Sequence, residues 1–107
     1  MVIGDLVFVS GQGSLDPKTG EVVRGDITEQ MKITVENIRI ILEGAGSSLK
    51  NVVKVTVYLS DMDLFSQMNE LYKEYFGPVY PARTTIQAGR LPFDIDIEID
   101  VTAYQSR

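Results

Sequence analysis

The chain has 107 residues, of which 44% are hydrophobic and 23% are charged, so its composition predicts one soluble globular domain spanning residues 1–107. Histidine and cysteine are both absent, which excludes Ser-His-Asp and Cys-His catalysis, thiolate zinc sites and disulfides, and leaves the cytoplasm as the expected compartment. The net charge of −5, with dispersed basic residues, argues against a nucleic-acid partner, and no apolar run is long enough to predict a membrane span.

The opening of the chain predicts a β-hairpin. Residues 6–10, Leu-Val-Phe-Val-Ser, have the composition of a short strand that ends at Gly11. Residues 16–20, Asp-Pro-Lys-Thr-Gly, form a turn signal, because proline presets φ and glycine tolerates positive φ. A second short strand is expected over residues 21–24.

The next segment predicts a helix that begins after Asp26. Asp26 and Glu29 have the spacing of a capping box, in which a side chain satisfies free N–H groups of the first turn. Apolar residues then recur every three or four positions, at Ile27, Met31, Val35, Ile38, Leu42 and Ala45. Gly44 and Gly46 supply the expected C-terminal stop.

The middle of the chain predicts a strand followed by a second helix. Residues 52–59 should form the strand, with Val53, Val55, Val57 and Leu59 on one face and Lys54, Thr56 and Tyr58 on the other. Ser60 or Asp61 is expected to cap the helix, and Gly77-Pro78 ends it. The apolar stripe of this helix comprises Leu64, Phe65, Met68, Leu71, Tyr72, Tyr75 and Phe76.

Two further strands, over residues 83–88 and 95–104, complete a β-β-α-β-α-β-β order. This order predicts an α+β fold in which both helices pack on one face of a single sheet. The opposite face then carries Val, Thr and Ile side chains that a lone monomer would leave in water. We therefore expect the chain to form a homo-oligomer.

The last predicted strand carries an alternating row of carboxylates, at Asp94, Asp96, Glu98 and Asp100. A period of two places all four on one sheet face. One interpretation is a half-buried strand with a solvated acidic side. The other is that one carboxylate lies in a cleft and works as a general acid or base.

Three other polar residues are candidates for a binding site. Arg83 stands at the start of a predicted strand, where its planar guanidinium could grip a carboxylate or form a salt bridge with one of the many acidic residues. Asn69 interrupts an apolar helix stripe, so it is either exposed or supplies an amide at an interface. Ser10 either donates a hydrogen bond to a ligand or only ends its strand.

Short motifs run along nearly the whole chain. They are Val9–Gln12, Asp16–Gly20, Glu36–Ile38, Ala45–Gly46, Val53–Val57, Met68–Tyr72, Tyr80–Thr84, Arg90–Pro92 and Ile97–Ile99. In this order they resemble the RidA/YjgF family of enamine/imine deaminases, also labelled endoribonuclease L-PSP-like. The resemblance implies a chorismate-mutase-like fold and a homotrimer with ligand sites between subunits.

The resemblance also implies the site. Arg83 matches the arginine that binds the substrate carboxylate, and Glu98 matches the glutamate that handles the attacking water. Ser10 and Asn69 match further site residues, and the backbone around Gly11 and Thr85 belongs to the same pocket.

The implied activity is hydrolytic deamination of small 2-enamine or 2-imine carboxylates, such as 2-aminoacrylate and 2-iminobutanoate, to 2-oxo acids and ammonia. It needs no cofactor and no metal. The alternative is a non-catalytic protein of the same fold that binds 2-oxo acids. RNA cleavage is a less favoured interpretation. A trimer would carry a net charge of three times −5, or −15, which repels the negatively charged phosphates of RNA.

Three positions depart from the family pattern. Members usually carry a tyrosine before the Ser10 strand, and the sequence begins at Met1, after that position. Either this start is genuine and that side of the pocket is open, or the sequence is a shortened form; the property affected is catalytic efficiency more than the fold. Thr85 stands where many members have cysteine, with little expected consequence. Phe93 makes the rim of the site more apolar.

Overall fold

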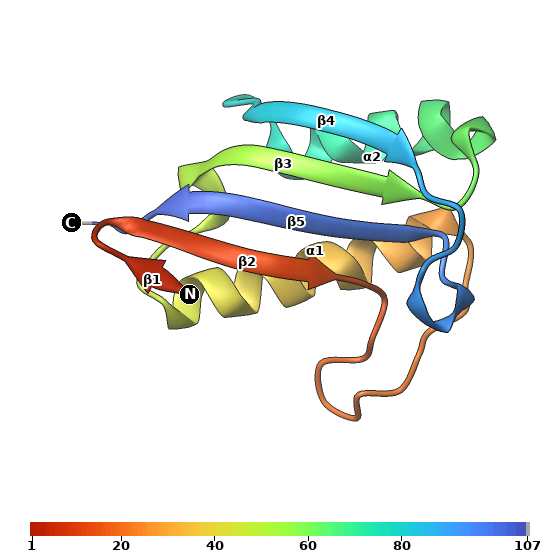
Figure 1. The fold of residues 1–107 in the computed structure, drawn as a ribbon, viewed down its shortest axis with the longest axis horizontal. Coiled ribbons are helices and arrows are strands. Elements are labelled where there is room, and N and C mark those ends of the chain that lie inside the picture. The colour runs from red at the N-terminus through yellow and green to blue at the C-terminus, as the bar shows by residue number, and fades with distance from the viewer. Residues whose placement is uncertain (107) are drawn as a thin grey trace.

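A computed structural model describes residues 1–106 as a mixed five-stranded sheet with two helices on one face (Figure 1). The strands are β1 (Val2–Ile3), β2 (Leu6–Gln12), β3 (Val52–Leu59), β4 (Ala82–Gln87) and β5 (Ile97–Tyr104), and the helices are α1 (Ile27–Gly44) and α2 (Phe65–Phe76). The strand order is β1-β2-β5-β3-β4, with β3 and β4 parallel and the other pairs antiparallel. The predicted α+β class, with both helices on one face of a single sheet, is confirmed, and the β-β-α-β-α-β-β order matches in type although the first two strands are not both the predicted segments.

The N-terminal hairpin is not the predicted one. β2 pairs with β1 across a tight turn, in which Gly4 adopts a φ of 59° that favours glycine. The predicted strand over residues 21–24 makes only one isolated bridge, between Leu15 and Val22. The side-chain amide of Asn37, on α1, accounts for this difference. It donates to loop carbonyl oxygens, including that of Leu15 at 2.7 Å, and so holds the loop against the helix.

Helix α1 starts and stops at the predicted residues. The Asp26 carboxylate accepts a hydrogen bond from the backbone N–H of Glu29 at 2.9 Å, as an N-cap should. At the other end Gly46 has a φ of 79°. The N–H groups of Gly46 and Ser47 therefore turn back to carbonyl oxygens of the last helical turn, at 3.2 and 2.8 Å, which is a Schellman motif.

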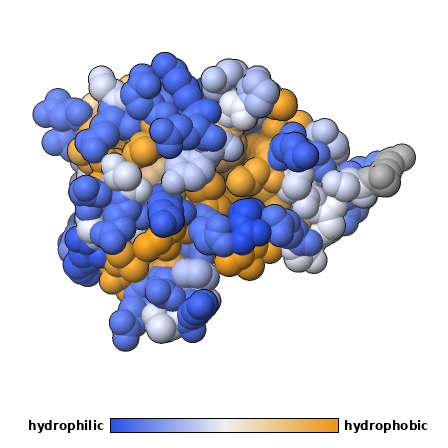
Figure 2. Space-filling view, turned by 180° about the vertical axis from the view of Figure 1, so that it is seen from behind, coloured by the Kyte–Doolittle hydropathy of each residue, from blue (hydrophilic) through white to orange (hydrophobic). Residues whose placement is uncertain are grey.

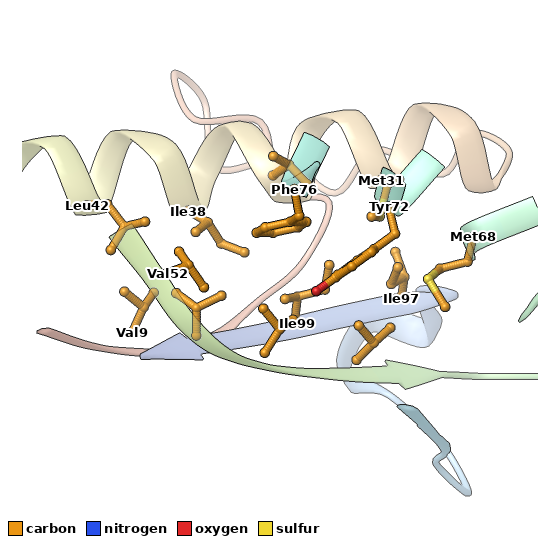
Figure 3. Packing of buried hydrophobic residues seen from close by; sticks show 14 of the residues in the cluster. Val9, Met31, Ile38, Leu42, Val52, Met68, Tyr72, Phe76, Ile97 and Ile99 are labelled. Carbon is orange, nitrogen blue, oxygen red and sulfur yellow. The ribbon is translucent and has the colours of Figure 1, made fainter. Parts of the chain in front are cut away.

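The hydrophobic core fills the space between the sheet and the helices (Figure 3). Its fully buried side chains come from α1, α2, β2, β3 and β5 and include Met31, Ile38, Leu42, Val7, Val55, Val57, Leu59, Met68, Ile97 and Ile99. Each such side chain contributes about 1.5–3 kcal/mol by leaving water. The helix stripes read from the sequence are therefore what fix both helices on this face.

One predicted core residue of β3 lies on the wrong side. Val53 is 44% exposed, whereas Val52 is 3% exposed and joins the core. The register between β3 and β5 shifts between Val52 and Lys54, which marks a β-bulge. Because an extra residue reverses the alternation of side chains, the predicted inward face starts at Val55 and not at Val53.

The other face of the sheet is left open by the described residues of one chain (Figure 1). Phe8, Ile86 and Tyr104 are 41%, 45% and 46% exposed there. Polar groups lie among them, such as Lys54, whose Nζ donates to Thr84 Oγ1 at 2.8 Å. Figure 2 shows the opposite side of the molecule, on which the helices lie, where hydrophilic side chains dominate and hydrophobic patches lie between them. The expected oligomer stays a prediction.

Gly46 provides a test of how α1 ends. Gly46→Ala is expected to lower the free energy of unfolding by about 1–2 kcal/mol, because an L side chain is strained in the left-handed region. Gly44→Ala is the matched control, since a Cβ there meets no atom within 4 Å, and helix propensity should raise stability by up to about 1 kcal/mol. Urea denaturation measures both. A Gly46→Ala protein as stable as Gly44→Ala would contradict the assigned motif.

Tyr58 and Asp100 provide a test of the open face. The Tyr58 hydroxyl donates to Asp100 Oδ2 at 3.1 Å, and this hydrogen bond, with the charge of Asp100, raises the pKa of Tyr58. The stabilisation is complete below the unfolded tyrosine pKa of about 10 and is lost as the pH rises through the higher folded pKa. Asp100→Asn is therefore expected to lower the pKa of Tyr58.

Ultraviolet absorbance of the phenolate follows this titration, and the Tyr58→Phe variant identifies the Tyr58 component by its loss. Asn can still accept a hydrogen bond but carries no charge, so the direction of the shift is the diagnostic quantity. An unchanged titration of Tyr58 in the Asp100→Asn variant would count against the hydrogen bond.

Candidate functional site

Arg83 lies beneath helix α2, at the edge of the sheet. It is the second residue of β4 and is in register with the core residue Val55, so its side chain leaves the sheet on the helix side. Its Nη1 donates to the Asn69 side-chain oxygen at 2.7 Å. The guanidinium carbon lies 4.5 Å from the ring centre of Tyr72 and 5.6 Å from that of Phe65. The guanidinium is thus held by one amide and two aromatic rings.

No carboxylate among residues 1–106 forms an ion pair with this guanidinium. The ion pairs among residues 1–106 involve Arg39, Lys73 and Arg90 instead. Arginine carries five N–H donors, and a single hydrogen bond holds the Arg83 head group. Arg83 therefore forms no salt bridge with an acidic residue among residues 1–106, and a salt bridge at an interface between copies stays a prediction.

A hollow of about 320 Å³ opens beside Arg83, lined by Asn69, Tyr72, Lys73, Tyr80, Pro81 and Arg83. Two of the lining residues, Arg83 and Lys73, are cationic. Lys73 forms an exposed ion pair with Glu70 at 3.2 Å, so Arg83 is the unneutralised cation of the hollow. A small anion with a flat carboxylate matches this chemistry.

Glu98 lies on the opposite, open face of the sheet. It is half-buried on β5, directly across from Tyr58 of β3. Its other neighbour is the backbone of β2, because a Cβ added to Gly11 would lie only 2.8 Å from Glu98 Cδ. Gly11 is therefore the residue that lets the glutamate pack this closely against the strand.

A second β-bulge places Ser10 and Gly11 beside this glutamate. Val9 pairs with Val101 and Gln12 with Ile99, so two residues of β2 face a single residue of β5 between these pairs. Ser10 is exposed, and it follows the buried Val9, so its hydroxyl lies on the open face. Bulges often re-aim side chains next to functional sites.

The six predicted site residues fall into two groups. Ser10, Gly11 and Glu98 lie together on the open face of β2 and β5. Arg83, Asn69 and Thr85 lie together around β4 and α2. Thr85 follows Arg83 on the same side of β4, and its buried hydroxyl has no hydrogen-bond partner among residues 1–106. Strand β3 separates the groups, which leave opposite faces, so one chain does not bring them together.

The predicted row of four carboxylates is wrong at two positions. Asp94 pairs with Arg90 at 2.6 Å, and this partner lowers the pKa of Asp94. Asp96 accepts hydrogen bonds from Ser60 at 2.8 Å and from Gln30 at 3.1 Å. The physical reason is local backbone geometry.

Phe93 and Asp94 have φ values of 62° and 55°, which turn the chain, and β5 begins only at Ile97. The alternation that the sequence suggests therefore applies from Ile97 onward. Of the other three carboxylates in the predicted row, Asp100 is the one that shares the open face of β5 with Glu98, and it accepts the hydrogen bond from Tyr58.

Tyr72 and Phe65 are site residues that the sequence reasoning assigned only to the apolar stripe of the second helix. The available signal was their spacing, since Phe65, Asn69 and Tyr72 stand at positions i, i+4 and i+7 and so share one helix face. An amide within such a stripe indicates a polar partner beneath the helix.

The described residues include neither a cluster of metal ligands nor a membrane-spanning helix. Within residues 1–106, no three Asp or Glu side chains gather as metal ligands would. In the same part of the chain, neither helix has both the length and the apolar character needed to cross a bilayer.

Known proteins resemble this chain over almost its whole length. The family model described as endoribonuclease L-PSP matches residues 1–105. A RutC family protein of Pyrococcus abyssi is 54% identical over 103 residues, which are 96% of this chain and 81% of the relative. TdcF of Escherichia coli, provisionally named a reactive intermediate deaminase, is 37% identical over 107 residues, with coverage of 97% and 82%.

Solved structures share the fold as well. The crystal structure of E. coli TdcF with bound serine has a TM-score of 0.91 at 37% identity, covering 99% of this chain and 85% of TdcF. That of RidA from an Antarctic Psychrobacter species has a TM-score of 0.92 at 38% identity, with coverage of 97% and 84%. The chain therefore belongs to the RidA/YjgF family, whose family model carries the description endoribonuclease L-PSP.

Proposed function

We propose that this protein hydrolyses small 2-imino carboxylates, or their enamine tautomers, to 2-oxo acids and ammonia. The observation that carries the proposal is the Arg83 guanidinium, which lines a hollow of about 320 Å³ and has no carboxylate partner among residues 1–106. The deaminase name of the relative TdcF supports this class of reaction. Substrates with three or four carbons, such as 2-aminoacrylate and 2-iminobutanoate, fit a single arginine anchor.

In the proposed reaction Arg83 binds the substrate carboxylate through parallel hydrogen bonds and so fixes the imine carbon. Glu98 orients a water molecule and accepts one of its protons as the oxygen attacks that carbon. The product is a tetrahedral carbinolamine. The first proton returns to the substrate nitrogen to complete the carbinolamine; Glu98 then transfers the remaining hydroxyl proton to the amine, and the C=O bond forms as the C–N bond breaks, which releases ammonia and leaves the 2-oxo acid with no oxidant or cofactor consumed.

The proposed site forms between copies of the chain. Arg83, Asn69 and Thr85 come from one copy, and Glu98, Ser10 and Gly11 come from its neighbour. A homotrimer, the assembly that the family resemblance implies, would build three such sites. The exposed apolar side chains of the open face support association through that face.

The alternative activity, binding of 2-oxo acids without turnover, also uses Arg83 but gives Glu98 no role. The two functions therefore differ in the effect of Glu98→Gln. Hydrolysis predicts that the variant loses rate and keeps its affinity for a 2-oxo acid. Binding alone predicts that the wild-type protein forms pyruvate no faster than buffer.

The first test generates 2-aminoacrylate in solution from serine with a dehydratase and measures pyruvate formation above the spontaneous rate. Glu98→Gln is expected to lower kcat by about 10²–10⁴-fold, the usual contribution of a general base. Arg83→Ala is expected to raise KM about 10–100-fold, because a charged hydrogen-bond partner is lost. Asp96→Asn is the control, since Asp96 lies off the strand face, and its rate should stay near that of the wild type.

The second test asks whether Arg83 and Glu98 act across copies. Arg83→Ala and Glu98→Gln chains, each of which should have little activity alone at substrate concentrations well below the wild-type KM, are unfolded together, refolded and assayed as a mixture under that condition. If each site takes Arg83 from one copy and Glu98 from its neighbour, a site is intact when the first copy is a Glu98→Gln chain and the second is an Arg83→Ala chain. In an equal mixture each condition holds for one-half of the positions, so about a quarter of the sites are intact.

Activity near a quarter of the wild-type rate is the expected outcome. A mixture as inactive as its parents would contradict a shared site. The control mixes Arg83→Ala with the Arg83→Ala/Glu98→Gln double variant, which offers no intact site and should stay inactive.

A further inference from the structure

Tyr72 forms the floor on which Arg83 rests. The guanidinium carbon is 4.5 Å from the centre of the Tyr72 ring, within the distance of a cation–π contact. We propose that Tyr72, with Phe65 and Asn69 around it, is a positioning residue that orients the guanidinium toward a carboxylate without neutralising its charge. The inference rests on the proposed function, because it assigns the substrate carboxylate to Arg83.

The ring is rigid enough for this role. Tyr72 is 4% exposed and stacks on Phe76, with ring centres 4.7 Å apart and planes inclined by 27°. Figure 3 shows both rings lying in the core between α2 and β5. A side chain packed in this way has one orientation, so the face that it presents to Arg83 is fixed.

The chemistry of the surrounding groups is neutral. Burial raises the pKa of Tyr72, so the phenol keeps its proton near neutral pH. Its hydroxyl has no hydrogen-bond partner among residues 1–106, and the ring face is therefore its contact with the cation. The other polar contact of Arg83 is the uncharged amide of Asn69, at 2.7 Å.

A neutral surround has a specific consequence for binding. When a carboxylate orients an arginine, that carboxylate neutralises the positive charge and occupies the parallel N–H donors. An arginine oriented by an amide and ring faces keeps both for an incoming anion, and it loses little side-chain freedom when the anion arrives. Loss of the ring should therefore weaken carboxylate binding even though the ring need not touch the ligand.

The experiment compares three variants of the full chain. Tyr72→Phe keeps the ring face and removes the hydroxyl, whereas Tyr72→Leu removes the ring. Tyr75→Leu is the matched control, because it removes a ring of the same helix that packs partly buried against the core and stacks neither on Arg83 nor on Tyr72. Thermal unfolding first establishes that each variant is folded at the assay temperature.

The first measurement is the affinity for 2-oxobutanoate, by titration calorimetry, with Arg83→Ala as the reference for lost binding. Tyr72→Leu is expected to bind about tenfold more weakly, the size of a desolvated cation–π contact. Tyr72→Phe and Tyr75→Leu should bind within about twofold of wild type on the same scale. In the deaminase assay Tyr72→Leu should raise KM and change kcat less.

The second measurement needs no ligand. The Nε–H proton of Arg83 should resonate upfield in the wild type and in Tyr72→Phe, because it lies near a ring face, and should move downfield in Tyr72→Leu. The proposal is overturned if Tyr72→Leu keeps both its affinity and the Arg83 signal, if Tyr72→Phe loses as much affinity as Tyr72→Leu, or if wild type and Arg83→Ala bind 2-oxobutanoate equally. Wild-type binding without any turnover would remove the deaminase function and leave the role of Tyr72 standing.

Discussion

The arrangement of this molecule depends on a sheet that buries only one of its two faces. Alternate side chains of every strand leave the sheet in opposite directions, and two helices cover one of those directions. Arg83 leaves on the covered side and Glu98 on the open side, with β3 between them. The same geometry that builds the core thus divides the candidate site, and the proposed reaction requires a second copy of the chain to complete it.

Uncharged groups orient the Arg83 guanidinium, and no carboxylate among residues 1–106 pairs with it. Its neighbours are an amide and two aromatic rings, and they fix its plane while leaving its charge available. The acidic excess of the chain would make ion pairing the ordinary fate of an arginine, as it is for Arg39 and Arg90. Arg83 lies on the edge strand β4 beneath α2 and has no carboxylate partner among residues 1–106, which supports its proposed role as the anchor of a substrate anion.

Much of the fold was predictable because it depends on local chemistry. Asp26 and Gly46 bound α1 through hydrogen bonds to nearby backbone groups, so their residue types alone identified the ends of the helix. The bulges of β2 and β3 were not predictable, since an extra residue in a strand is defined only against its partner. Val53 was assigned to the wrong face for this reason, and the N-terminal hairpin was missed because Asn37, distant in sequence, holds the competing loop.

For the candidate site too, some features were predictable from the sequence and others depended on tertiary structure. Residue identity alone determined that any chemistry must rest on carboxylates, arginine, hydroxyls and amides, and the motif order determined the family and singled out Arg83 and Glu98. Tertiary structure decided that these two side chains leave opposite faces, that Asp96 turns away to bond Gln30, and that Tyr72 lies under the guanidinium. The reason is that a side chain's type is written in the sequence, whereas its neighbours are set by strand register and helix packing, which join residues far apart in the chain.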